Sequence, residues 1–109
     1  MKISRKEEIE KRWRAFSLPE QMGNIGSEVG RAAKWQNRNK KAFWGAVTRA
    51  IELFELTLAD RRWGGEKIEI GRAKEVFCDA VLGGKEYNSN LGDLEKYFMQ
   101  FALLANRNK

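Results

Sequence analysis

The apolar residues of this chain recur at alternating spacings of three and four, which is the period of an amphipathic helix. One such series starts at Leu18 and continues through Met22, Ile25, Val29 and Ala32 to the polar Gln36. The residues Ser17-Leu18-Pro19-Glu20 in front of it have the form of a capping box. A proline is tolerated in the first turn because its missing N–H would have no partner there. The pattern predicts a long helix over residues 18–36.

Three more long helices are predicted over residues 41–62, 66–82 and 91–106. The first of these has apolar residues over half its circumference and should be the most buried element. We expect Trp63-Gly64-Gly65 to end it and Gly83-Gly84 to end the next, because glycine is favoured just past a helix C-terminus. Asn90 is the expected N-cap of the last helix.

A shorter leader helix is expected over residues 4–15. Only Ile9, Trp13 and Phe16 fall at helical spacing there, a stripe wide enough to dock on a bundle but too narrow to build one. Short polar connections between long amphipathic helices favour an antiparallel up-down arrangement. The sequence therefore predicts an all-α fold, an antiparallel up-down four-helix bundle with a short N-terminal leader. A single domain would span residues 1–109, with the leader in 1–16 and the four-helix core in 17–106.

Composition narrows the functional classes. The 109 residues include no histidine and one cysteine, Cys78. This removes the usual general base near neutral pH, any Cys/His zinc set and an internal disulfide. The acids Glu52, Glu55, Glu69 and Asp79 are expected on exposed faces, so no convergent carboxylate pair is predicted. We expect a non-enzymatic protein without a metal or cofactor, and an enzyme that uses only carboxylates and lysines is the less favoured alternative.

No apolar stretch approaches the about 20 residues that span a bilayer. The N-terminus also lacks the apolar segment of a signal peptide. The expected location is therefore the cytoplasm, without a membrane partner.

Charge is unevenly distributed. The formal net charge is +6; residues 1–50 carry 12 basic and 5 acidic side chains, whereas residues 51–95 carry 6 and 10. No acidic residue occurs between Glu28 and Glu52. An asymmetry of this kind indicates a polyanionic partner.

Basic residues next to aromatic ones suit phosphate contacts combined with stacking on unpaired bases. The partner would then be RNA or single-stranded DNA. A solvated basic surface with tryptophans in the core explains the same pattern about equally well. The residues predicted to bind nucleic acid are Arg12, Arg14, Arg31, Lys34, Trp35, Arg38, Lys40, Lys41, Arg61 and Arg62.

Small residues line one face of the helix over residues 18–36. Each helical glycine costs roughly 0.5–1 kcal/mol relative to alanine, so close packing must offset the cost. The neighbouring helix could belong to this chain or to another copy, and we expect the protein to form a homo-oligomer. The residues of this predicted packing or oligomer face are Gly23, Gly26, Ser27 and Gly30.

A polar network is predicted between the first two long helices. It would consist of Asn24, Glu28 and Arg49, with an ion pair between Glu28 and Arg49 that fixes the helix register. A recognition site formed by the same residues is the alternative.

The stretch from Asn24 to Arg31 resembles the N-I-A-E-G-x-G-R segment of a four-helix-bundle family. Members of that family are encoded in intervening sequences of 23S rRNA genes, and relatives are accessory proteins of diversity-generating retroelements. Asn24, Ile25, Gly30 and Arg31 match in register, whereas positions 26–28 depart from the pattern. The resemblance implies a basic bundle that self-associates and, in the retroelement branch, works with a reverse transcriptase and RNA. Prokaryotic HEPN ribonucleases are also helical, but their R-x(4–6)-H motif needs a histidine that this chain lacks.

The favoured function is therefore that of a non-enzymatic accessory protein that binds nucleic acid through its basic ends and self-associates. The alternative is a protein–protein adaptor or assembly subunit whose partner is an acidic protein.

Overall fold

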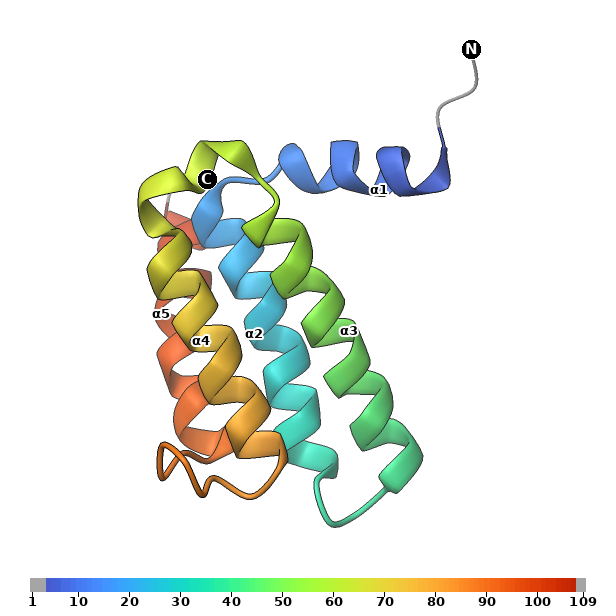
Figure 1. The fold of residues 1–109 in the computed structure, drawn as a ribbon, viewed down its shortest axis with the longest axis vertical. Coiled ribbons are helices and arrows are strands. Elements are labelled where there is room, and N and C mark those ends of the chain that lie inside the picture. Colours follow the sequence, from blue (N-terminus) through green and yellow to red (C-terminus); the bar gives the residue numbers. More distant parts are fainter. Residues whose placement is uncertain (1–3, 108–109) are drawn as a thin grey trace.

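The computed structural model describes residues 4–107, and over that range the chain is all-helical without a strand (Figure 1). The all-α prediction is confirmed. Residues 1–3 of the predicted leader and residues 108–109 of the predicted domain lie outside the described residues. The elements are α1 (Arg5–Arg14), α2 (Leu18–Trp35), α3 (Lys40–Leu58), the 3₁₀ helix η1 (Arg61–Glu66), α4 (Lys67–Val81) and α5 (Leu91–Arg107).

The helix starts follow the capping signals of the sequence. Ser17 Oγ accepts a hydrogen bond from the Glu20 amide at 3.3 Å, and the Glu20 carboxylate accepts one from the Ser17 amide at 2.9 Å, which completes the capping box of α2. Asn39 caps α3 by accepting from the Ala42 amide. Asn90 Oδ1 accepts from the Asp93 amide at 2.8 Å, which confirms Asn90 as the cap of α5.

The second long helix ends earlier than predicted. α3 stops at Leu58, and the segment expected to continue it to residue 62 turns into η1. Asp60 causes the change, because its carboxylate accepts from the Arg62 amide at 3.1 Å and caps a new helical segment. Gly64 and Gly65 therefore lie inside η1 and do not end α3. By contrast, Gly83 and Gly84 follow α4 with the positive φ angles that the prediction requires.

The four long helices lie side by side, and α1 projects sideways from one end (Figure 1). α2 packs against both α3 and α5, and α4 contacts α3 and α5. Phe54, Phe77 and Phe98, from three different helices, meet in the centre with ring centroids 5.8 and 5.9 Å apart. Ile25 and Val29 of α2 are fully buried beside them, as the apolar seam predicts.

The three glycines of α2 face α5 of the same chain. A Cβ placed at Gly26 would lie 2.5 Å from Phe98 Cβ, and one at Gly23 would lie 3.3 Å from Ala102 Cα. At Gly30 the nearest atom is the carboxylate of Glu95. The predicted packing face is thus used within the chain and is closed to a second copy. Ser27 does not belong to this face: its exposed hydroxyl donates to the Gly23 carbonyl at 3.3 Å.

α1 is attached to the other helices mainly by one side chain. Trp13 is the only buried residue of α1, and its indole N–H donates to Thr57 Oγ1 of α3 at 3.0 Å. The leader therefore docks as predicted. None of the helices in residues 4–107 combines the length and apolarity that crossing a membrane requires.

Candidate nucleic-acid interface

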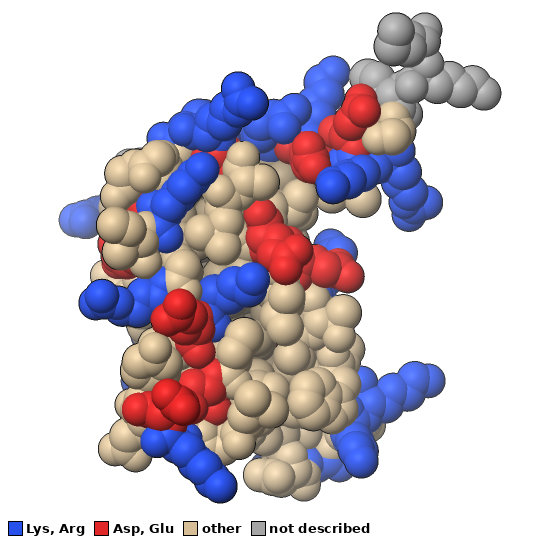
Figure 2. All heavy atoms as spheres, viewed as in Figure 1, with Lys and Arg blue, Asp and Glu red and all other residues tan. Residues whose placement is uncertain are grey.

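The predicted nucleic-acid-binding residues separate into two groups at opposite ends of the molecule (Figures 1 and 2). One group lies on α1 and η1, where cationic side chains gather at the top of Figure 2. The other group surrounds the turn between α2 and α3 and the start of α3, at the lower right of Figure 2. The two ends differ in how many of their cations are already paired.

Part of the positive charge on α1 and η1 is neutralised within the chain, by ion pairs of Arg14 and Arg62. Arg62 Nη2 lies 2.7 Å from Asp60 Oδ2 and also donates to the Phe16 carbonyl at 2.9 Å, while the guanidinium stacks over Trp63 at 4.3 Å. Arg14 lies 3.9 Å from Glu10. Of the four predicted binding residues at this end, Arg12 and Arg61 have no ion pair among the described residues.

A buried polar network holds this end together, and the sequence patterns did not predict it. The Gln21 amide donates to Asp60 Oδ2 at 3.1 Å and to the Trp13 carbonyl at 3.0 Å, and its oxygen accepts from Trp63. The hydrogen bonds from Arg62, aided by that from Gln21, lower the pKa of Asp60 to about 2 although its burial acts in the opposite direction. The network joins α1, α2 and η1, so it serves the fold.

The turn between α2 and α3 has a defined backbone. Asn37 takes a positive φ of 64°, the left-handed conformation that asparagine tolerates better than most residues. The amides of Arg38 and Asn39 both donate to the Trp35 carbonyl, at 2.9 and 3.0 Å. Residues 36–40 line a hollow of about 460 Å³ together with Phe43, Trp44 and Val81.

Three cations around this turn carry no ion pair within the described chain: Arg38, Lys40 and Lys41. All three are exposed. Arg31 differs, because its guanidinium lies 2.8 Å from Glu28, and Lys34 differs because its ammonium lies 5.0 Å from the centre of the Trp35 ring. The acid-free segment of the sequence therefore becomes a surface with unpaired positive charge.

The aromatic residue best placed for stacking is Trp44, which was not among the predicted site residues. It is 44% exposed and contacts Phe43 edge-to-face, with ring centroids 5.0 Å apart. Trp35 packs against the hydrophobic core and is only partly accessible. The sequence does contain an indication of this role: Trp44 follows Lys40 by four residues and therefore lies on the same side of α3.

The predicted ion pair between Glu28 and Arg49 does not form, although Asn24, Glu28 and Arg49 line one hollow. Glu28 pairs with Arg31 of its own helix, Arg49 lies 3.7 Å from Glu52 on α3, and the Asn24 amide donates to the Glu20 carbonyl. Each of these side chains bonds to a residue three or four positions away in its own helix, so none of these bonds joins two helices.

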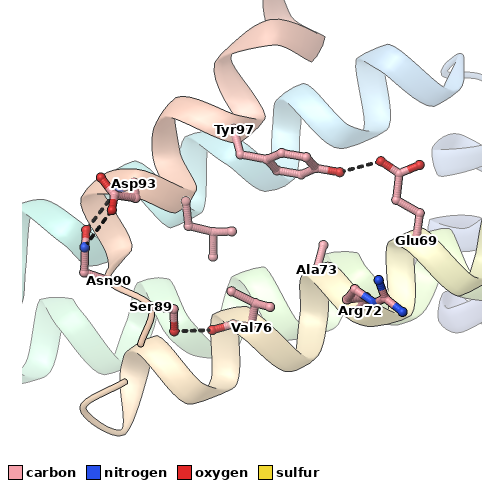
Figure 3. A pocket seen from close by; sticks show the side chains of 9 residues that line it. Glu69, Arg72, Ala73, Val76, Ser89, Asn90, Asp93 and Tyr97 are labelled. Atoms are coloured by element: carbon pink, nitrogen blue, oxygen red, sulfur yellow. Dashed lines mark hydrogen bonds between the residues drawn. The ribbon is translucent and has the colours of Figure 1, made fainter. Parts of the chain in front are cut away.

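A second cavity, of about 390 Å³, opens between α4 and α5 (Figure 3). Tyr97 points across it, and its hydroxyl donates to Glu69 at 2.8 Å; burial and this bond raise the pKa of Tyr97. Ser89 donates to the Val76 carbonyl near the other end. The walls are mainly apolar, with Ala73 and Val76 on α4, and the site lacks the clustered cations that a phosphate backbone needs.

Asp79 lies near this cavity and corrects another prediction. It was expected on an exposed face but is only 9% exposed, because its carboxylate accepts from Ser89 Oγ and from the amides of Glu86 and Tyr87. These bonds, against the opposing effect of burial, lower the pKa of Asp79 and fix the loop between α4 and α5. Within residues 4–107 no three metal-binding side chains gather into a possible metal site.

No family model matches the chain, and no curated protein or solved structure is significantly similar to it. The resemblance of residues 24–31 to the bundle family stays a prediction from those residues.

Proposed function

We propose that this protein binds single-stranded nucleic acid through the α2–α3 turn, and that contacts to the phosphate backbone supply most of the affinity. The observation that carries the proposal is the placement of Lys40 and Lys41 in the first turn of α3. The N-terminus of a helix carries a partial positive charge, so cations there are unfavourable and anions are favourable. A phosphate bound at this position would reduce the repulsion between the two lysines and the positive end of the helix.

The surroundings of the turn support the same assignment. Arg38 adds a third unpaired cation, and the half-exposed Trp44 ring offers a surface on which one base can stack. Stacking requires an unpaired base, so RNA or single-stranded DNA fits better than a duplex. Because contacts to the phosphate backbone carry no sequence information, we expect little sequence preference.

In this proposal the scaffold is an antiparallel up-down four-helix bundle. The contacts of α2 with α3 and α5, and of α4 with both, support a closed arrangement of four helices, and the chain reverses direction between successive long helices in Figure 1. A bundle of this kind presents its interhelical turns at its ends, where a strand of nucleic acid can reach them.

The proposed protein is a non-enzymatic, cytoplasmic accessory factor that also self-associates. The resemblance of residues 24–31 implies a reverse transcriptase as a further partner. The inward-facing glycines of α2 cannot provide the surface for self-association, so another surface must do so.

The protein–protein adaptor remains the second candidate because α5 exposes apolar side chains. Met99 is 53% exposed and Leu103 is 64% exposed on the same helix. They lie four residues apart and thus on one face, which an apolar partner helix could cover.

The experiment that separates the two candidates compares two variants with three substitutions each. Arg38→Ser/Lys40→Ser/Lys41→Ser removes the unpaired cations of the turn, and Arg12→Ser/Arg14→Ser/Arg61→Ser removes the same charge from the other end. We expect the first variant to bind single-stranded RNA at least about tenfold more weakly in fluorescence anisotropy, and the second to lose much less. Equal losses would mean that net charge alone drives binding, and an absence of binding by the unaltered protein would favour the adaptor.

A further inference from the structure

A hollow of about 900 Å³ lies beneath α1, between that helix and the outer surfaces of α2 and α3. Figure 2 shows it on the right, with acidic side chains on α3 below it and side chains of both signs on α1. It exists because α1 projects from the other helices and touches them only through its C-terminal part, around the buried Trp13. The nucleic-acid proposal does not use this hollow, and the buried network of Asp60 meets it only at Trp13 and Phe16.

The charge of the hollow is nearly balanced. Its cations are Arg5, Lys6, Arg12, Arg31 and Arg49, and its acids are Glu10, Glu28, Glu52 and Glu55. Four carboxylates would repel a polyanion, so this hollow is unsuited to nucleic acid although the whole protein has a net charge of +6. A lining of both signs suits a protein surface that carries both signs as well.

Both walls of the hollow carry both signs, but they differ in which sign is in excess: α1 contributes three cations and the acid Glu10, whereas α2 and α3 contribute three acids and the cations Arg31 and Arg49. Arg5, Lys6 and Arg12 on α1 have no ion pair within residues 4–107. Glu52 and Glu55 on α3 have only loose partners, at 3.7 and 3.5 Å, and their side chains are 59% and 65% exposed. An α1 helix that approached this part of α3 from outside would therefore bring positive charge towards negative charge.

Exposed apolar side chains on α1 and just after it lie in the same hollow. Ile9 is 45% exposed and Phe16 is 37% exposed, and the half-buried Leu56 of α3 lies on the opposite wall. A ten-residue helix is only marginally stable on its own, and Trp13 is the one buried side chain that anchors this helix. A second apolar contact through Ile9 would stabilise it.

We propose that the hollow is the dimer interface, and that α1 of each copy packs into the hollow of the other copy. The inference rests on the proposal that the protein self-associates. The hollow contains both halves of the contact: a helix with an excess of positive charge and the apolar Ile9, and an opposite wall with an excess of negative charge and the apolar Leu56. A two-fold axis therefore places each α1 against the partner's α3 and uses the same surface twice.

The test reverses the charge of one wall at a time. One variant is Lys6→Glu/Arg12→Glu, and the other is Glu52→Lys/Glu55→Lys. Each variant alone brings like charges together in the dimer, so its dissociation constant should rise by about tenfold or more. An equimolar mixture pairs the acidic α1 of one variant with the basic α3 of the other and should restore the dimer in analytical ultracentrifugation. Because a misfolded variant cannot be rescued by mixing, recovery also excludes a folding defect.

A second pair of variants tests the apolar contact. Ile9→Glu should weaken the dimer, whereas Ile68→Glu, at a position on α4 that is 80% exposed and outside the hollow, should leave it intact. A trimer or another odd-numbered assembly of the unaltered protein, or variants that all keep the dimer, would overturn the proposed interface.

The outcomes also separate this inference from the proposals above. An unaltered protein that is monomeric would refute self-association itself, and a dimer that is insensitive to both charge reversals would refute only the interface. The variant with serine at positions 38, 40 and 41 should dimerise normally, so failure of nucleic-acid binding leaves the dimer test unaffected.

Discussion

At the scale of single residues, the α2 glycines show how differently the same residue type is used. The sequence predicted that all three lie on a packing face, and all three do face α5. What it could not show is the identity of the opposing atom, because that depends on how α5 is rotated about its axis. A buried Phe98 Cβ opposes Gly26, whereas the end of a flexible glutamate side chain opposes Gly30.

This difference predicts opposite effects of alanine. Gly26→Ala should lower the free energy of unfolding by about 1–3 kcal/mol, because the new methyl group overlaps an atom that cannot move without shifting the core. Gly30→Ala should leave stability unchanged or raise it by up to about 1 kcal/mol, because Glu95 can swing away and alanine is the better helix former. Urea denaturation of both variants measures the difference, and a Gly30→Ala loss as large as that of Gly26→Ala would contradict the assigned packing.

Asp60 makes the stability of the protein depend on pH in a definite direction. Its pKa is about 2 in the folded chain, below the ordinary value of 3.8, so the unfolded state takes up the proton first as pH falls. The stabilisation, about 2 kcal/mol, is complete above about pH 5 and is lost progressively as pH falls towards about 2.

Asp60→Asn should therefore destabilise the protein at neutral pH, and the difference from the unaltered protein should shrink as pH falls through that window. Thermal unfolding measured across the acidic range checks this, with the exposed Glu66→Gln as control, which should change stability by less than about 0.5 kcal/mol. A difference that stays constant down to pH 2 would contradict the assignment.

At the scale of elements, the sequence predicted helices well where local signals decide. The caps at Ser17 and Asn90 and the glycines after α4 lie within a residue or two of their predicted places. The end of α3 was missed because it depends on Asp60, whose carboxylate is held by Gln21 of α2 as well as by the neighbouring Arg62. Gln21 is fully buried, but a single buried glutamine does not appear in a periodic pattern of apolar residues.

The attachment of α1 is a second property of an element that can be tested. Trp13→Ala should release α1, because it removes the one buried side chain of that helix and its hydrogen bond to Thr57. We expect trypsin to cut after the basic residues of α1 several times faster, while residues 17–107 stay resistant. Trp44→Ala, which removes a half-exposed tryptophan elsewhere, is the control and should not accelerate cleavage of α1. Unchanged cleavage of the Trp13 variant would show that other contacts hold the helix.

At the scale of the whole molecule, the two basic ends have different chemistry although the sequence treated them alike. On α1 and η1 the cations alternate with acids, and Arg62 is committed to Asp60. At the α2–α3 turn Arg38, Lys40 and Lys41 have no ion pair within the described residues, and the two lysines lie at the N-terminus of α3. The sequence pattern selected the ten predicted residues. It could not show which of the cations form ion pairs, because an ion pair depends on where each side chain points. The proposed site therefore consists of Arg38, Lys40 and Lys41, with Lys34 and Trp44 nearby.

The salt dependence of binding to single-stranded RNA tests this account most directly. Each neutralised phosphate contributes about −0.7 to the slope of log affinity against log salt on a single strand. About four contacts at the turn predict a slope of roughly −3 for the unaltered protein, and the variant with serine at positions 38, 40 and 41 should retain a slope of about −1. A slope near zero for the unaltered protein, or one that the three serines leave unchanged, would contradict nucleic-acid binding at the α2–α3 turn.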